Sequence, residues 1–514
     1  MITRKTRFCV TLCLAAMFLA GIACPAMAAK FSQRELAYMP ATLQIELFKR
    51  GDITPLDVLK AQKAEYDRTE KEVNAVTVAY WDQAMKLAEE SAQRYADGTY
   101  RVLEGVTAGI KDEHYDKGWV VTQGSLVHKN DPPKDHADPI VAKLKAAGAI
   151  PVFQTTVPEL YLNYTTYTLA WGVSRNPWNL KYAVGGSSGG SGAALAAGYC
   201  TIATGSDMGG SIRIPCAFNG LYGIKPAFGY FHTDMPLSVF SGSGPMARTF
   251  ADVVMMYNVI AGPDKYSLNV ASSPQYPLTY QSIKGMKIAY VGGMGIVKPS
   301  KDVAAAMAEA VKVLQAQGAA VDIVDFSFGA SPDKMAAEFN KLALAGAMGG
   351  MLADYANKEE EFTPYFRYFM EKAAKGGYGN VQLGEAEQFI RKLYQALADQ
   401  IFGKGYDVVL CPTMPTSHIP ADWDPTKAGA EVVDGDEKFH RMAGSLYTLP
   451  FNFLNWCPVV SVPAGISPQN MPIGMQIVGK PHDTETVLRV AYAFSKGGLK
   501  FYTGKLFPEA AYAK

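Results

Sequence analysis

Residues 185–229 read GGSSGGSGAALAAGYCTIATGSDMGGSIRIPCAFNGLYGIKPAFG. Two glycine runs in this stretch carry serines: Ser187 lies in the first run, and Ser211 follows 24 residues later in the second. Glycine adopts backbone conformations that other residues avoid and lets a neighbouring group approach the main chain closely. Short, unrepeated runs between apolar residues are not typical of flexible Gly/Ser linkers. The stretch therefore predicts exposed hydroxyls and backbone N–H groups that point into a site, around a close-packed helix at residues 193–198.

Helix and strand patterns alternate over most of the remaining chain. Amphipathic spacing and capping residues predict helices at residues 41–50, from 55 onward, 82–96, 139–147, up to 260, 303–317 and 484–495. Short apolar runs predict strands at residues 74–80, 105–111, 150–154, 287–292, 320–326, 406–412, 458–463 and 473–479. Residues 176–182 and 421–440 are predicted to be loops. This alternation favours an α/β fold whose sheet has helices on both faces.

Residues 327–405 differ from the rest because they combine a mostly helical pattern with bulky side chains. These side chains are Phe362, Tyr365, Phe366, Tyr368, Phe369 and Met370. Helical spacing alone explains most of them, so we favour an ordinary helix core. The alternative is a cap over a pocket that holds an apolar substrate.

The first 28 residues have the pattern of a cleavable signal peptide. Arg4, Lys5 and Arg7 precede an apolar run at residues 8–23, and Ala26-Met27-Ala28 forms an A-x-A cleavage site. The apolar run is short for a membrane anchor, and no later stretch is long and apolar enough to span a membrane. Cys24 raises the alternative of a lipoprotein signal, which Gly21 disfavours because a larger aliphatic residue is usual there. We expect an exported protein, periplasmic or secreted.

Composition and charge favour a globular protein without a polyanionic partner. The chain has 514 residues, 48% of them hydrophobic and 19% charged, which is enough for a large core. Removal of the three basic leader residues from a total of 49 leaves 46 basic against 48 acidic residues. A nearly neutral chain without a basic patch gives no reason to expect nucleic acid or an anionic membrane as a partner. The oligomeric state stays open, a homodimer included.

Cysteines and histidines do not indicate a metal site. Of seven cysteines, three leave with the leader, and the other four are Cys200, Cys216, Cys411 and Cys457. Export would permit disulfides, in any of three full pairings, but apolar neighbours favour buried free thiols. The seven histidines are scattered and no C-x-x-C occurs, so we expect neither a metal nor another cofactor.

The two serines need a base to become nucleophiles, because a hydroxyl is weakly nucleophilic on its own. Lys111 ends a predicted apolar strand, where burial would disfavour its charged form and make it a base. The backbone N–H groups of the glycine turn are candidates for an oxyanion hole, and they belong to Met208, Gly209, Gly210 and Ser211.

Asp207 and Arg213 flank the same turn with opposite charges. The simpler interpretation of this pair is structural, with the two charges fixing the conformation of the turn.

With these spacings, the chain resembles the amidase signature family of serine hydrolases. The motifs that carry the resemblance are the lysine segment from residue 105 to 112, GGSSGGSGAALAAG, GSDMGGSIRIP, GIKP, GPMAR and NMPIGMQIVG. The resemblance implies one large α/β/α domain over residues 29–514, with a central mixed, twisted sheet, and amidase activity on a small-molecule amide without a cofactor. Ser206, Gln154 and Cys457 depart from the usual threonine, lysine and glycine, which leaves the shape of the pocket open.

The resemblance also implies a role for each candidate residue. Ser211 matches the nucleophile, Ser187 matches a bridging serine whose preceding peptide bond is cis, and Lys111 matches the general base. Members act on aryl and aliphatic amides, peptide amides, fatty acid amides and cyclic oligoamides, or form the A subunit of the tRNA-dependent amidotransferase. The predicted export signal argues against the last role.

Three other interpretations stay open. Residues 185–189 satisfy the G-x-S-x-G pattern of α/β hydrolases, which would make Ser187 the nucleophile of an esterase or lipase with a later histidine, namely His418, His440 or His482. The predicted loop before residue 185 disfavours the esterase interpretation, because the G-x-S-x-G motif follows a strand.

A phosphate-binding module would use the helix N-terminus, but neither nucleotide-binding glycine motif is present. The third is an inactive relative that only binds its ligand.

Overall fold

The computed structural model describes residues 31–232, 239–268, 270–342, 355, 358–376, 380–427, 431–434, 437–441, 444–504 and 506–508. The predicted signal peptide, with Cys24, lies outside these residues.

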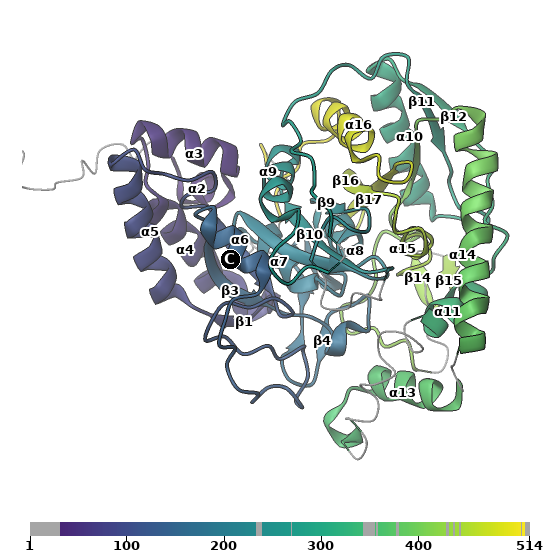
Figure 1. Ribbon diagram of the computed structural model, residues 1–514, viewed down its shortest axis with the longest axis horizontal. Helices are drawn as coiled ribbons and strands as arrows, with labels where there is room; N and C mark the ends of the chain where they lie inside the picture. The colour runs from purple at the N-terminus through teal and green to yellow at the C-terminus, as the bar shows by residue number, and fades with distance from the viewer. Residues whose placement is uncertain are drawn as a thin grey trace, which may run out of the picture.

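An eleven-stranded sheet forms the centre of the molecule (Figure 1). Its strands, in spatial order, are β1 (Val76–Ala79), β3 (Ile150–Thr155), β2 (Thr107–Lys111), β8 (Ile202–Asp207), β10 (Gly242–Ala247), β9 (Tyr222–Lys225), β16 (Val459–Ile466), β17 (Pro472–Val478), β13 (Val408–Pro412), β11 (Lys287–Tyr290) and β12 (Ala320–Ile323).

The sheet is mixed, as expected from the resemblance. β2 runs parallel to both β3 and β8, and β11 runs parallel to both β12 and β13. The other neighbouring pairs are antiparallel. Eight of the eleven strands lie in segments predicted as strands, whereas β8, β9 and β10, in the glycine-rich region and its continuation to Ala247, were not predicted.

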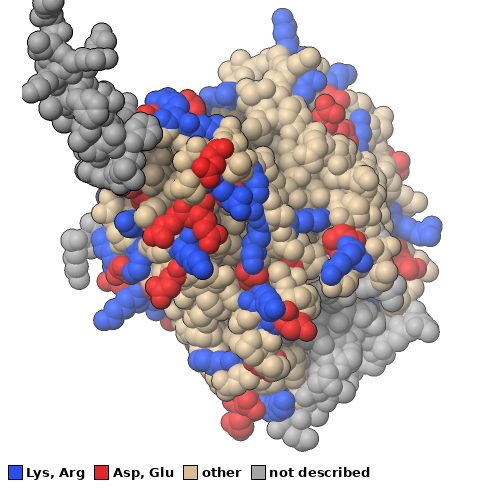
Figure 2. Space-filling view, turned by 60° about the vertical axis from the view of Figure 1, so that its left-hand side comes forward, with Lys and Arg blue, Asp and Glu red and all other residues tan. Residues whose placement is uncertain are grey.

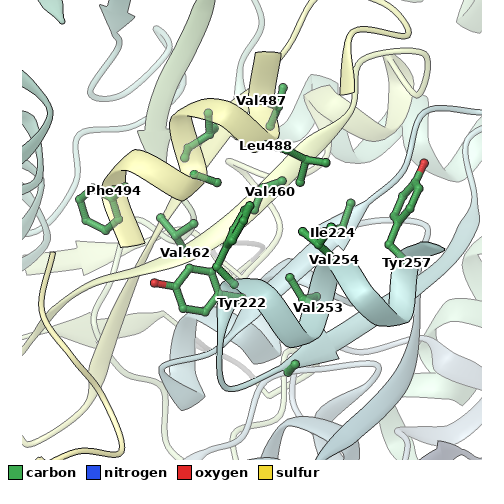
Figure 3. Packing of buried hydrophobic residues seen from close by; sticks show 14 of the residues in the cluster. Tyr222, Ile224, Val253, Val254, Tyr257, Val460, Val462, Val487, Leu488 and Phe494 are labelled. Carbon is green, nitrogen blue, oxygen red and sulfur yellow. The ribbon is translucent and has the colours of Figure 1, made fainter. Parts of the chain in front are cut away.

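Helices cover both faces of the sheet, which confirms the α/β prediction. α6 (Pro139–Ala146), α9 (Phe250–Ile260), α10 (Lys301–Ala316) and α16 (Thr484–Gly497) pack on one face. Figure 3 shows Val460 and Val462 of β16 facing Leu488 and Phe494 of α16. α7 (Gly189–Ala196) and α8 (Arg213–Asn219) pack on the opposite face.

Four N-terminal helices gather beside the β1 end of the sheet (Figure 1). They are α2 (Gln33–Tyr38), α3 (Ala41–Arg50), α4 (Pro55–Val73) and α5 (Trp81–Ala96). The start of α4 follows the sequence, because the Thr54 hydroxyl accepts a hydrogen bond from the Asp57 N–H and Pro55 occupies the first helical position.

Two segments predicted as loops contain short strands instead. β6 (Arg175–Asn176) and β7 (Asn179–Ala183) form a hairpin, and β14 (Val432–Asp434) pairs with β15 (Glu437–Phe439). Both ladders are two-stranded and lie outside the main sheet, as does the pair of β4 (Tyr167–Thr168) and β5 (Gly172–Val173). Tertiary burial stabilises the β6–β7 hairpin, since Trp178 at its turn is almost fully buried. The polar composition of this segment does not reveal that burial, so the sequence predicted a loop.

Where it is described, the aromatic segment at 327–405 is helical. It contains α11 (Pro332–Leu342), η4 (Glu359–Glu361), α13 (Pro364–Gly376), α14 (Asn380–Gln400) and η5 (Phe402–Lys404). α14 packs against α11, and the two join the core cluster that contains Leu393 and Leu397. Phe362, Tyr365 and Phe366 form a separate small core with Leu160 and Tyr355. The prediction of ordinary helix core is therefore correct for Tyr365 and Phe366, which lie on α13, whereas Phe362 lies between η4 and α13.

The four cysteines outside the leader are free and buried, as predicted. Burial raises the pKa of the thiols of Cys200, Cys411 and Cys457 to about 12. In the described residues, no helix is long and apolar enough to cross a membrane, and no cluster of three or more His, Cys, Asp or Glu could hold a metal ion. Lys/Arg and Asp/Glu side chains are interspersed on the face displayed in Figure 2.

Candidate active site

Lys111 lies at the end of β2 with its side chain fully buried. Its Nζ donates hydrogen bonds to Ser187 Oγ at 2.9 Å and to Ser206 Oγ at 2.6 Å, and it lies 2.9 Å from Glu113 Oε2. Because β2 and β8 are parallel neighbours, their carboxyl ends meet at one edge of the sheet. Ser206, near the end of β8, thus reaches the lysine. The structure brings Lys111 and Ser187 together across 76 residues of sequence.

Ser187 lies directly before α7, and the peptide bond between Gly186 and Ser187 is cis, as the resemblance implied. The hydroxyl was expected to be exposed, but Ser187 is only 2% exposed. The glycines around it are packed: a Cβ on Gly190 would lie 2.3 Å from the Thr156 nitrogen. Close packing on β3, rather than exposure, explains the glycine pattern at this serine.

Ser211 lies on the turn between β8 and α8, which the buried Asp207–Arg213 pair fixes. Arg213 Nη2 and Nε donate to Asp207 Oδ1 and Oδ2 at 2.8 and 2.9 Å, and both side chains are fully buried. Asn452, from α15 (Pro450–Phe453), donates to the same carboxylate at 2.8 Å. Burial would raise the pKa of Asp207, but the Arg213 charge and these hydrogen bonds outweigh it and lower the pKa to about 2.

One of the four predicted oxyanion-hole donors is already used within this turn. The Gly210 N–H donates to Asp207 Oδ1 at 2.8 Å. The N–H groups of Met208, Gly209 and Ser211 donate to no other described residue. Gly210 has a φ of 122°, and a Cβ there would lie 2.3 Å from Thr448 Oγ1, so the turn requires glycine. The candidate oxyanion hole therefore has three available N–H donors instead of the predicted four.

The backbone of Ser188, the residue after Ser187, contacts Ser211. The Ser188 N–H donates to the Ser211 carbonyl at 3.2 Å. Between the Ser187 and Ser211 hydroxyls, the described residues show no hydrogen bond, and catalytic hydrogen bonds often close only when substrate is bound. Gly186 and Ser211 both line one cavity, which places the Ser187 segment and the Ser211 hydroxyl at the same site.

This cavity has a volume of about 370 Å³. Met208, Gly209 and Ser211 form its wall on the side of the sheet. Its apolar and aromatic lining includes Leu162, Ile214, Phe339, Tyr365, Tyr368, Phe369 and Leu449. Three of these side chains belong to α13, so this helix also walls the pocket. The cap interpretation of residues 327–405 stays a prediction.

Charged side chains line the same cavity beyond the aromatic wall. His440 Nε2 lies 3.1 Å from Asp333 Oδ1, and Lys372 and Arg441 place their cationic groups 5.3 and 5.8 Å from the Tyr368 ring. The walls are therefore not uniformly apolar.

The sequence analysis did not identify Glu113 and Tyr161 as part of the site. The Ser206 hydroxyl donates to Glu113 Oε2 at 2.6 Å, which closes a group of three polar side chains, Ser187, Ser206 and Glu113, around Lys111 Nζ. Tyr161, from η2 (Glu159–Tyr161), places its ring 5.0 Å from the same nitrogen. The sequence shows Glu113 as a charge at the end of a predicted strand, but its contact with Ser206 depends on the pairing of β2 with β8.

In the described residues, none of the three candidate histidines forms the hydrogen bond with Ser187 that the esterase interpretation requires. His418 lies 3.0 Å from Ser417 Oγ, His440 pairs with Asp333, and the His482 ring contacts Tyr230. Within the described part of the chain, the hydrogen-bond partner of Ser187 is Lys111.

Comparison with known proteins gives one consistent result. The family model described as Amidase matches residues 57–488. The glutamyl-tRNA(Gln) amidotransferase subunits A of Geotalea daltonii and Carboxydothermus hydrogenoformans are each 31% identical to this chain, covering 87% and 90% of it and 95% and 98% of their own lengths.

Solved structures share the fold. A bacterial aryl acylamidase of the amidase signature family has a TM-score of 0.80 at 24% identity, covering 90% of this chain and 96% of its own. The peptide amidase of Stenotrophomonas maltophilia has a TM-score of 0.75 at 21% identity, covering 90% and 97%. The family match along most of the chain, together with relatives aligned over nearly their whole length, establishes that the chain belongs to the amidase signature family of carbon–nitrogen hydrolases.

Proposed function

We propose that this protein hydrolyses a carboxylic amide through an acyl-enzyme on Ser211, with Ser187 as proton bridge and Lys111 as base. The observation that carries the proposal is the 2.9 Å hydrogen bond between Lys111 Nζ and Ser187 Oγ, buried beside the turn that bears Ser211. A base, a hydroxyl that relays protons and a second hydroxyl at a cavity are the groups that serine acylation needs.

In the acylation step, neutral Lys111 takes the proton of Ser187 while Ser187 takes the proton of Ser211. Ser211 Oγ bonds to the carbonyl carbon, and the carbonyl oxygen gains the negative charge. Backbone N–H groups of Met208, Gly209 and Ser211, which donate to no other described residue, then donate to that oxygen. The proton then returns through Ser187 to the leaving nitrogen, the C–N bond breaks, and ammonia or an amine leaves.

Deacylation uses the same route with water as nucleophile. Water gives its proton through Ser187 to Lys111 and attacks the ester carbon. The bond to Ser211 Oγ breaks, Ser211 regains a proton, and the free acid departs. The net reaction is amide plus water to acid plus ammonia or amine.

The cavity favours amides with an apolar or aromatic portion. Its aromatic side chains bury such a group, and burial of apolar area contributes about 25 cal/mol per Å². Relatives of this fold include proteins named aryl acylamidase, 6-aminohexanoate cyclic dimer hydrolase and peptide amidase, so we propose anilides, linear or cyclic aliphatic amides and peptide amides as the panel to assay.

Labelling by an alkyl fluorophosphonate tests the serine assignment without knowledge of the substrate. Ser211→Ala should abolish covalent labelling and turnover, whereas Ser187→Ala and Lys111→Ala should slow labelling of a serine that is still present. Labelling that survives in Ser211→Ala and disappears in Ser187→Ala would reverse the roles of the two serines.

We also propose that the protein is exported with cleavage after Ala28. The support is the basic, apolar and A-x-A pattern of residues 1–28. Fractionation of cells that express the full chain, followed by N-terminal sequencing, should yield a mature protein that begins at Ala29 outside the cytoplasm. An intact Met1 in the cytoplasmic fraction would contradict export.

A further inference from the structure

The group of polar side chains around Lys111 Nζ has a fixed direction of hydrogen bonding. A carboxylate only accepts hydrogen bonds, and a serine hydroxyl has one hydrogen to donate. Ser206 uses its hydrogen on Glu113 Oε2, 2.6 Å away. Glu113 and Ser206 can therefore only accept from Lys111, at 2.9 and 2.6 Å.

Ser187 is the one member of this group whose hydrogen is free to point at the lysine. A neutral amine has two N–H donors and one lone pair. If the two donors serve Glu113 and Ser206, the lone pair faces Ser187 Oγ, 2.9 Å away. Proton transfer from Ser187 to Lys111 then needs no reorientation of the amine.

Glu113 is also placed to act as a counter-ion. Burial on its own would raise the pKa of Glu113, but the Lys111 charge, His114 and the Ser206 hydrogen bond hold it below its ordinary value. The carboxylate thus favours the ammonium form of Lys111, whose three N–H donors match the three oxygen acceptors around it. Lys111 is fully buried, whereas the Glu113 side chain remains 29% exposed.

We infer that Glu113 is a positioning residue: with Ser206 it aims the lone pair of neutral Lys111 at Ser187, and its charge sets the pH above which that neutral form is available. This inference rests on the proposed function, because it assigns a task to Glu113 only if Lys111 is the base. Under this inference Glu113, the residue directly after Lys111 and Asp112, determines the pH range in which the enzyme works.

Other ionisable groups that face Lys111 and Glu113 stay constant in the test. His114, on the same segment, bonds Thr204 and Ser243 at 3.1 Å, and the Tyr161 ring lies over the lysine from η2. Burial raises the pKa of Asp112 to about 6, and its carboxylate accepts from Thr122. An inflection that every variant shares, Glu113→Gln included, therefore does not arise from Glu113.

The test is the second-order rate constant for alkyl fluorophosphonate labelling, measured between about pH 5 and 10. We expect Glu113→Gln to move the midpoint of the rising limb at least about one pH unit lower, because an opposite charge at this distance shifts a titration by about 1–3 units. The matched control is Asp135→Asn, which removes a 94% exposed carboxylate that contacts His136. Its midpoint should match that of the wild type.

Ser206 supplies a second measurement if Glu113→Gln fails to fold. Ser206→Ala should lower the plateau rate about 10- to 100-fold through misorientation of the amine, and Ser206→Thr, which keeps the hydroxyl, should restore it. A folded Glu113→Gln with the wild-type midpoint, or a Ser206→Ala with the wild-type plateau, overturns the inference. Labelling that persists in Ser211→Ala would instead refute the proposed function.

Discussion

Asp207→Asn tests whether one buried carboxylate holds the turn that bears Ser211. Asp207 accepts hydrogen bonds from Gly210, Arg213 and Asn452, and neither it nor Arg213 is exposed to water. The lowering of its pKa from 3.8 to about 2 corresponds to about 2 kcal/mol in favour of the ionised form. Removing one partner of a buried ion pair also leaves the other charge uncompensated, which costs about 3–5 kcal/mol. We expect the free energy of unfolding to fall by about that larger amount.

Urea unfolding followed by tryptophan fluorescence measures this change. The matched control is Glu309→Gln, which breaks an ion pair with Lys312 whose side chains are 69% and 67% exposed. Exposed pairs contribute about 0–1 kcal/mol, so the control should be nearly as stable as the wild type. A loss below about 1 kcal/mol in Asp207→Asn would refute the argument, because no buried charge would then have been left unpaired.

The same variant has a defined pH signature. A carboxyl whose pKa is lowered by folding contributes its stability above its unfolded pKa, and that contribution disappears as the pH falls through the folded value. For Asp207 the window runs from about 4 down to about 2. The stability difference between wild type and Asp207→Asn should be constant above pH 5 and shrink towards pH 2. A difference that grows as the pH falls would contradict the assignment.

Three further predictions concern stability, the pocket and the thiols. Burial raises the pKa of Glu70 from 4.5 to about 8. The neutral carboxyl is compatible with burial, so stability falls as the pH rises from 4.5 through about 8 and Glu70 ionises. Glu70→Gln should therefore raise Tm at pH 9 but not at pH 5. Thr363→Val removes the 2.7 Å hydrogen bond to buried Glu159 that anchors α13, which should cost about 1–3 kcal/mol in urea unfolding and raise KM for amides with long apolar groups. An Ellman assay of protein cleaved after Ala28 should find no reactive thiol in the native state and four after denaturation, since Cys200, Cys216, Cys411 and Cys457 are free and buried.

Local sequence signals predicted most of the sheet and its helices because each depends on nearby residues. The Thr54-Pro55 pair determined where α4 begins through a capping bond three residues long. The same kind of signal failed for β14 and β15, which are three residues each and lie in a segment of polar composition. Two-residue or three-residue ladders depend on what packs over them, which periodicity does not encode.

The centre of the site was predictable only in part. The spacing of the glycine signature, compared with a known family, indicated that Lys111 and Ser187 would meet, and they do so at 2.9 Å. The contact between Ser206 and Glu113 joins residues 93 positions apart through the pairing of β2 and β8. The sequence shows only that Ser206 stands where the family usually has threonine. In the structure, this hydroxyl is the link between the carboxylate and the lysine.

The structure distinguishes the two serines by their exposure. Both lie in glycine-rich runs, and the sequence predicted exposed hydroxyls at both. Ser187 is 2% exposed and is not among the described residues that line the cavity, whereas Ser211 lines it. A nucleophile must reach the carbonyl carbon of the substrate, while a proton bridge needs to reach only the base and the nucleophile. The burial of Ser187 therefore supports the order in which Ser211 attacks and Ser187 relays, and it argues against an esterase in which Ser187 is the nucleophile.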